Sequence, residues 1–259
     1  MKRFLFLLTL GLPMLCQASD YQSTLLVQTG VLRESDLVVR TISDLESNRI
    51  CLAFYVRTMG TSPAMTCYDV ASGFRSRIDQ VGHFKEGKLV VRKMKDFVNN
   101  VSCLVSYVST EGTSPAIDCY SANSGAKFRD GESLVPSGHL REGDLDVYRI
   151  VDPDSTKSCM IAYVNTGNTS PSLQCYSTRS ATGKGGLAQT SHMREGDLIV
   201  RKVIDEDNNK ECLITYVSTE GTSPFIHCAD ARGAAKPAAA AGDATAQPQY
   251  RPQYRPTTP

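Results

Sequence analysis

The stretch that decides the fold is CLITYVSTEGTSPFIHC, from Cys212 to Cys228. Two short runs rich in apolar and β-branched residues flank a Thr-Glu-Gly-Thr turn, and a cysteine closes each end. Short runs of this composition on either side of turn residues predict a β-hairpin. We therefore expect two antiparallel strands whose cysteines face each other.

The same pattern occurs four times. Its centre, YVSTEGTSP, is identical at Tyr107–Pro115 and Tyr216–Pro224, and looser copies begin at Tyr55 and Tyr163. Successive repeats have their first cysteines 52, 56 and 53 residues apart, and the two cysteines within each repeat are always 16 apart. Such self-similarity indicates tandem units that bury their apolar faces against one another. The repeats lie near residues 31–70, 83–122, 139–178 and 192–231.

One hairpin register accounts for the cysteine, tyrosine and proline positions. With the cysteines opposite each other, Tyr55 falls opposite Pro63, and the other repeats give the same pair. Cross-strand disulfides fit non-hydrogen-bonded pairs, where the Cα atoms are closest and proline's missing N–H costs no ladder bond. The spacing, without a Cys-x-x-Cys pair, argues against zinc. The predicted disulfides are Cys51–Cys67, Cys103–Cys119, Cys159–Cys175 and Cys212–Cys228.

The N-terminus has the pattern of an export signal. Residues 1–18 combine a basic start at Lys2 and Arg3, a short apolar run and a small residue at Ala18, which is typical of a signal peptide. A lipid anchor on Cys16 is the less favoured alternative, because Leu15 stands where a small residue is expected. We expect an exported protein that is periplasmic, on the outer surface or secreted.

Charge and hydropathy narrow the range of partners. Without residues 1–18 the chain has 26 Lys and Arg against 27 Asp and Glu, a balance that gives no electrostatic reason to expect nucleic acid. No stretch is long and apolar enough to predict a transmembrane segment. The oligomeric state stays open.

The repeats predict an all-β domain over residues 19–230. Each unit shows three short strands, and the segments between the repeats are expected to supply a fourth. We expect a closed four-bladed propeller, in which the N-terminal strand completes the last repeat's sheet. The alternative is a paired or open array of three-stranded units. Residues 231–259 are Ala- and Pro-rich, which is typical of a disordered tail.

Candidate chemistry is sparse. Ser114 and Ser223 lie in repeated turns and have no evident triad partners, so we expect no catalytic serine. Three histidines share one repeat position, and in a closed ring they would form a metal site. They are His83, His139 and His192. Apart from that metal alternative, the sequence predicts no cofactor.

The favoured function is therefore binding without catalysis. We expect an exported β-repeat protein that presents its hairpin turns to a protein or a cell-envelope component. Carbohydrate binding through the turns and Tyr faces is a second hypothesis, weakened by the absence of Trp. A metal-binding protein or enzyme using the repeated histidines is a third. The candidate partner-binding residues are Glu111, Thr113, Glu220 and Thr222 in the turns, and Tyr250, Arg251, Tyr254 and Arg255 in the tail.

Overall fold

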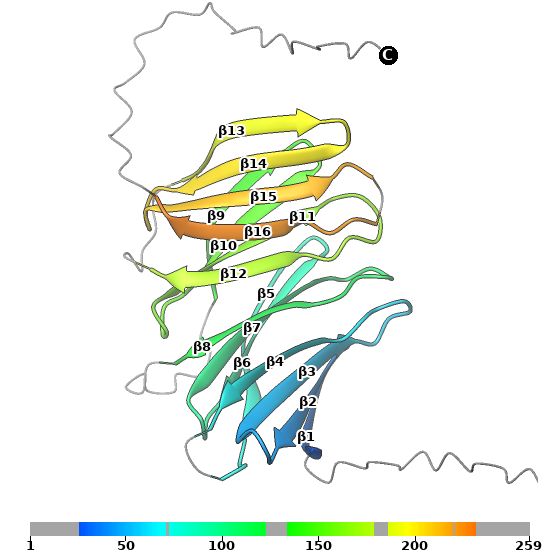
Figure 1. Ribbon diagram of the computed structural model, residues 1–259, viewed down its shortest axis with the longest axis vertical. Helices are drawn as coiled ribbons and strands as arrows, with labels where there is room; N and C mark the ends of the chain where they lie inside the picture. The colour runs from blue at the N-terminus through cyan, green and yellow to red at the C-terminus, as the bar shows by residue number, and fades with distance from the viewer. Residues whose placement is uncertain (1–25, 71–72, 123–133, 179–185, 220, 232–259) are drawn as a thin grey trace, which may run out of the picture.

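The computed structural model describes residues 26–70, 73–122, 134–178, 186–219 and 221–231 (Figure 1). Within these ranges every element is a β-strand, as the repeat pattern predicts. The predicted signal peptide and residues 232–259 lie outside them. In chain order the strands are β1 (Leu26–Glu34), β2 (Leu37–Asp44), β3 (Arg49–Val56), β4 (Ala64–Asp69), β5 (Ile78–Glu86), β6 (Leu89–Asp96), β7 (Val101–Val108), β8 (Ala116–Ser121), β9 (Val135–Glu142), β10 (Leu145–Asp152), β11 (Lys157–Val164), β12 (Ser172–Ser177), β13 (Leu187–Glu195), β14 (Leu198–Asp205), β15 (Lys210–Val217) and β16 (Phe225–Asp230).

Each repeat forms one four-stranded antiparallel sheet whose strands follow one another in chain order. The first strand of each sheet begins in the segment before the repeat and continues into it, so the expected fourth strand is present. It is joined to the second strand by a two-residue turn with a left-handed residue, Ser35 or a glycine such as Gly87 at φ 56°. Left-handed residues match such turns to the twist of the strands.

All four predicted disulfides are present. The ladders place Cys51 opposite Cys67, and the equivalent cysteines are opposite each other in the other three sheets. The bonded Cα atoms are 4.0 to 4.1 Å apart, which is the close spacing of a non-hydrogen-bonded pair. The β3–β4 ladder ends with Phe54 opposite Ala64, one residue short of the expected Tyr55–Pro63 pair, because β4 begins directly after Pro63.

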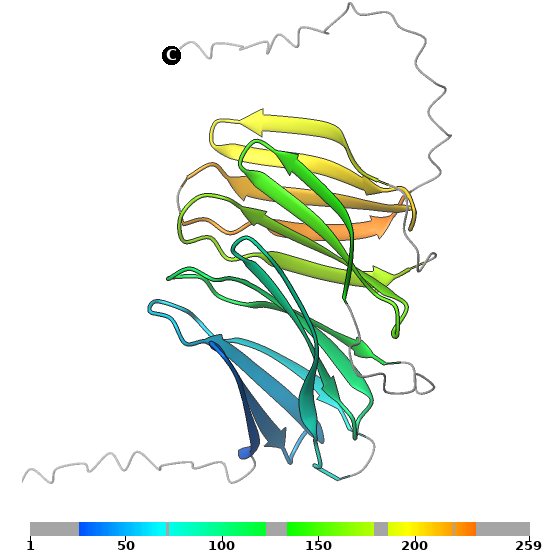
Figure 2. The same cartoon turned by 180° about the vertical axis from the view of Figure 1, so that it is seen from behind.

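The four sheets stack in a row and do not close into a ring. Strand β8 contacts both β4 and β12, and β12 contacts β16, so each sheet packs on the next. Figures 1 and 2 show the first and fourth sheets at opposite ends of the molecule. The expectation of a closed propeller was therefore wrong. Strand β1 pairs with β2 of its own sheet, which leaves the fourth sheet complete without it.

Three apolar cores lie in the seams between neighbouring sheets. In the first seam, Leu52 and Phe54 of the first sheet pack with Val105 and Tyr107 of the second. The second and third seams repeat this arrangement. The inner sheets are covered on both faces, so every residue of β6 and β10 is buried. In the last sheet, β15 alternates between more and less exposed residues, because one face lies outside.

Polar contacts also cross every seam, and one series of them runs from each sheet to the next. The tyrosine that follows the second cysteine of a repeat donates a hydrogen bond to an aspartate at the end of the second strand of the next sheet. The three bonds join Tyr68 to Asp96 at 2.6 Å, Tyr120 to Asp152 at 2.9 Å and Tyr176 to Asp205 at 2.7 Å. The fourth repeat has Ala229 at the tyrosine position.

Buried cations reinforce the second and third seams. Lys93 Nζ lies 2.8 Å from Asp152 and 3.2 Å from Asp154 of the next sheet. Arg149 bonds Asp205 and lies 2.8 Å from Asp207 in the same way. Lys93, Arg149, Asp152 and Asp205 are at most 1% exposed, so each charge depends on its partner.

Disulfides are typical of an oxidising compartment, such as the extracellular space or the periplasm. The presence of four agrees with the compartment expected from the sequence. In the described part of the chain, no helix is long and apolar enough to cross a membrane.

Candidate functional sites: a ridge of turns and an asymmetric pocket

The repeated Thr-x-x-Thr-Ser-Pro turns are built by their own side chains. In each turn the second threonine donates a hydrogen bond to the carbonyl of the valine that ends the preceding strand. Thr61 Oγ1 lies 2.8 Å from Val56 O, and Thr113 Oγ1 lies 2.6 Å from Val108 O. Thr169 and Thr222 do the same. The threonine is thus explained by the geometry of the turn.

The described parts of the four turns are hydrogen-bonded into one ridge, which we call the turn ridge (residues 57–63, 109–115, 165–171, 218–219 and 221–224). Serine side chains form most of the links. Ser62 N donates to Ser114 Oγ at 3.0 Å, and Ser114 N donates to Ser170 Oγ at 2.6 Å. Ser170 N continues the series to Ser223 Oγ at 3.0 Å. These serines therefore position neighbouring turns.

The turns approach one another closely at their left-handed residues. Gly60 and Gly112 have φ of 75° and 76°. A Cβ on Gly60 would lie 3.4 Å from Gly112 Cα, and one on Gly112 would lie 3.4 Å from the Asn168 side chain. Gly112 N also donates to Met59 O at 2.8 Å. The positive φ favours glycine at both positions, and the third turn has Asn168 there, at φ 61°.

The structure separates the candidate turn residues. Glu111 is exposed at the tip of the second turn, whereas Thr113 is fully buried and bonded within its turn. Thr222 is half-buried, and its hydroxyl is bonded to Val217 O at 2.6 Å. Met59, which the sequence reasoning did not select, is 74% exposed on the first turn. Glu220 and the four tail candidates, Tyr250, Arg251, Tyr254 and Arg255, lie outside the described residues.

A polar pocket of about 320 Å³ lies between the second and third sheets. Its centre is a buried carboxylate, Asp146, whose Oδ1 is 3.0 Å from His139 Nε2 and 3.9 Å from Arg141 Nε. The lining residues are Glu86, Gly87, Lys88, His139, Arg141, Asp146, Tyr148, Tyr163 and Asn165. They come from the β5–β6 turn and from β9, β10 and β11 with its following turn.

Three stacked aromatic rings form one wall of the pocket. The His139 and Tyr148 rings stack with centroids 4.2 Å apart, and the Tyr148 and Tyr163 rings lie parallel at 6.2 Å. Tyr148 also donates a hydrogen bond to Glu86 at 3.4 Å. Burial raises the pKa of Tyr148, and the nearby Tyr163 and Glu86 raise it further. Both tyrosines therefore keep their hydroxyl protons at neutral pH.

This pocket is where the repeat pattern is broken. In the first and third seams an arginine, Arg92 or Arg201, donates to a tyrosine hydroxyl, which in turn donates to an aspartate of the preceding sheet. The middle seam keeps the tyrosine, as Tyr163, but replaces the arginine and the aspartate. Tyr148 stands at the position of Arg40, Arg92 and Arg201, Lys88 at that of Asp36, Asp144 and Asp197, and Asp146 at that of Val38, Val90 and Ile199.

The sequence reasoning missed Asp146, Tyr148 and Lys88, although the signal was available. It looked for residues that the repeats share, whereas these three are residues in which one repeat differs. A comparison of the second strands position by position would have found Asp146 and Tyr148. A buried carboxylate needs a hydrogen-bond partner to offset the cost of its removal from water, whereas the apolar residues at the same position need none.

The three candidate metal ligands lie on three successive sheets. His83 is on β5, His139 on β9 and His192 on β13, each opposite the second strand of its own sheet. Burial and the neighbouring cations Arg92 and Lys85 lower the pKa of His83. In the described ranges, no group of three or more His, Cys, Asp or Glu side chains is arranged to hold a metal ion. Metal binding stays a prediction that metal analysis of the purified protein would test.

The sequence matches no described protein family, and no curated protein is similar to it. The assignment of function therefore depends on the geometry of the ridge and the pocket.

Proposed function

We propose that this chain is an exported, non-enzymatic binding protein that presents the turn ridge to a protein or cell-envelope partner. The observation that carries the proposal is the set of serine bonds that link all four turns. Turns linked in this way are preorganised, so little conformational entropy is lost when a partner binds along them. The exposed residues differ from turn to turn, as Met59 in the first and Glu111 in the second show, so each turn offers a partner a different side chain.

Charge reversal on the ridge tests this proposal. We expect Glu111→Lys to weaken capture of the partner by the immobilised protein from a cell-envelope fraction. Glu206→Lys is the matched control, because Glu206 is also exposed but lies in the β14–β15 turn, at the other end of the strands. Equal capture by both variants and the unchanged protein would exclude the second turn as a contact. A chain that ends at Ala231 lacks the four tail candidates, so any partner that it still captures does not depend on them.

The pocket supports a second candidate function, the binding of a small polar molecule such as a sugar. It combines acceptors on Glu86 and Asp146 with donors on Lys88 and Arg141, and hydroxyl-rich ligands need both. The repeated tyrosine faces favour this function less, since Tyr107 and Tyr216 are at most 2% exposed. A glycan array tests it, with Lys88→Asp as the variant, because aspartate is the residue that the other repeats carry there. Unchanged sugar binding by this variant, or no binding by the parent protein, would remove the pocket from consideration.

A further inference from the structure

The outer face of the fourth sheet carries apolar residues at the positions that are buried at the internal seams. Leu198, Leu213 and Val217 are 42%, 43% and 37% exposed, whereas their counterparts in the first three sheets are all nearly fully buried by the sheet that follows. Phe225, on the same face, is 65% exposed. A terminal repeat that faces water normally has a polar outer face. Nothing in the described residues covers this one.

The outer face of the first sheet is also apolar. Val31 and Met65 are 45% and 65% exposed, and the register places them opposite Arg40 and Ala53, on the side away from the first seam. The Met65 counterpart in the fourth sheet, Ile226, is 5% exposed because a preceding sheet covers it. The molecule therefore ends in two different sheet faces, each of which has a buried equivalent inside the stack.

The fourth sheet carries the cation, and the first sheet the carboxylates, of an ion pair like those that cross the internal seams. Inside the stack, Lys93 and Arg149 each reach two carboxylates of the next sheet. Lys202 holds the same position in the fourth sheet, and the matching carboxylates in the first sheet are Asp44 and Glu46. Charge complementarity thus extends from the last face to the first.

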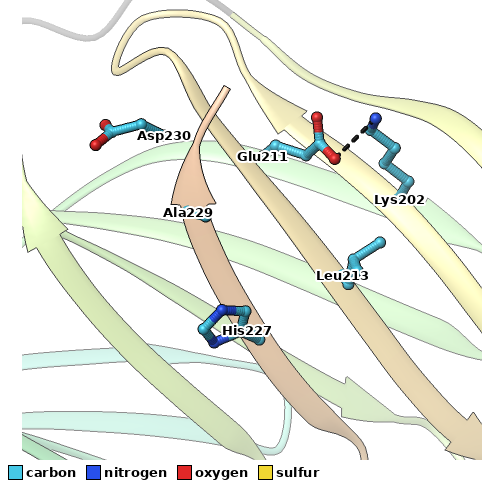
Figure 3. Close-up of a pocket in the computed structure, with 6 residues that line it drawn as sticks. All are labelled: Lys202, Glu211, Leu213, His227, Ala229 and Asp230. Carbon is cyan, nitrogen blue, oxygen red and sulfur yellow. Dashed lines mark ion pairs between the residues drawn. The ribbon is translucent and has the colours of Figure 1, made fainter. Parts of the chain in front are cut away.

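Both groups have local partners in the single chain. Lys202 lies 2.8 Å from Glu211 of its own sheet, and both side chains are about one-third exposed, at 34% and 31% (Figure 3). Figure 3 shows this pair beside Leu213 and His227 at a hollow in the outer face. Asp44 accepts hydrogen bonds from the backbone of its own turn, at Glu46 and Ser47. At the internal seams the equivalent aspartates, Asp152 and Asp205, keep such turn bonds and also bond across to the adjacent sheet.

Two further kinds of contact that cross the internal seams have one partner on the first sheet and the other on the fourth. Tyr216 donates to Asp144 of the preceding sheet at 2.9 Å, and the corresponding pair across a joint between copies is Tyr55 with Asp197. The serine series of the turn ridge ends at Ser223 and begins at Ser62. A second copy placed on the fourth sheet would continue both series.

We propose that copies of this chain stack head to tail, with the β13–β16 face of one copy against the β1–β4 face of the next. Such an interface joins two different surfaces, so copies add in one direction and form an open filament unless the rotation at each joint closes a ring. The joint has Ala229 where the internal seams have a tyrosine, so it lacks one of their hydrogen bonds. It is therefore weaker than an internal seam, and assembly depends on concentration.

Charge reversal at the two faces tests the proposal. We expect the disulfide-bonded chain from residue 19 to 259 to form species of increasing mass as its concentration rises in sedimentation velocity runs. Lys202→Glu places like charges at the joint, and so does Asp44→Lys, so each variant alone should remain monomeric. An equimolar mixture should assemble again, because each joint then pairs opposite charges. Lys85→Glu, on exposed β5, is the control that should leave assembly unchanged.

The mixture distinguishes a defect of the joint from a defect of folding, because misfolded variants do not restore each other. A monomeric parent chain at all concentrations would overturn the proposal. So would assembly of either single variant to the same extent as the parent, since another surface would then be responsible. If the full chain were monomeric while a chain ending at Ala231 assembled, residues 232–259 would be the occupant of the face, and the proposal would also fail.

Discussion

At the residue scale, the stack is held by charges that have almost no access to water. Arg149 is fully buried, and its guanidinium bonds Asp205, lies 2.8 Å from Asp207 and donates to the Ser137 hydroxyl at 2.8 Å. A buried ion pair contributes little compared with an apolar pair, but the loss of one partner leaves an uncompensated charge. The second and third seams therefore depend on both partners of each pair being present.

Removal of Arg149 should be costly. We expect Arg149→Met to lower the free energy of unfolding by about 3–5 kcal/mol, because the Asp205 carboxylate stays buried without its cation. Arg49→Met is the matched control, since Arg49 and Asp69 form an exposed pair, with side chains 54% and 81% exposed. The control should change stability by less than about 1 kcal/mol. Urea titrations measure both, and similar losses would show that the buried pair contributes no more than the surface pair.

The seam tyrosines predict alkaline sensitivity. Burial and the neighbouring aspartates raise the pKa values of Tyr120 and Tyr176 above the ordinary value of 10.0. Below that pH the tyrosines are protonated in both states, so their contribution is complete. Above it the unfolded chain loses these protons first, and the free energy of unfolding should fall as the pH rises further.

Stability measured by urea titration between pH 8 and 11, together with tyrosinate absorbance, checks this prediction. The pH range is about that in which an unperturbed tyrosine titrates. Tyr120→Phe and Tyr176→Phe should reduce the alkaline loss, because phenylalanine has no proton to release. An alkaline loss of the same size in the double variant would assign it to other groups.

At the element scale, the hairpin is the part that the sequence predicted best. The register of Cys51 and Cys67 follows from local alternation and the turn between them, and the structure confirms it in all four repeats. The buried role of Thr113 was not predicted, because a threonine in a turn has the same sequence pattern whether its hydroxyl faces solvent or the Val108 carbonyl. The pocket was not predicted either, since Asp146 and Lys88 meet only when two sheets stack.

Each disulfide should contribute to stability mainly through its hairpin. We expect the pair of substitutions Cys159→Ala and Cys175→Ala to lower the free energy of unfolding by about 3 kcal/mol, the value for a loop of this length. The two cysteines are 16 residues apart, as in every repeat. Thermal or urea unfolding of the double variant measures the loss. A change below about 1 kcal/mol would show that the seams alone hold the register.

At the scale of the whole molecule, contacts form between neighbouring sheets. The sequence predicted the repeat but not the arrangement, because the repeats show the same alternating pattern whether they close into a ring or stand in a row. What distinguishes the two is whether the first and fourth sheets pack on each other, and in this molecule they lie at opposite ends. The free energy of unfolding of such a stack is close to the sum of the contributions of its single sheets and of the seams between them.

Stability should therefore fall from the middle of the stack toward its ends. We expect amide hydrogen exchange to be slowest in β6, β7, β10 and β11, which are buried on both faces, and faster in β14 and β15. Exchange measured by mass spectrometry after pepsin digestion checks the order. Uniform protection across all four sheets in dilute solution would instead indicate a single cooperative unit.

The row of cross-linked hairpins also has a mechanical consequence. Tension applied between the two ends of the stack passes through the seams in series, but each disulfide carries the load past the hairpin that it closes. With a sequence separation of 16 between the paired cysteines, each hairpin withholds about 50 Å of extended chain, and the four together withhold about 200 Å. Under load each disulfide thus keeps its own hairpin closed, and a reducing agent sets how far the chain can then extend.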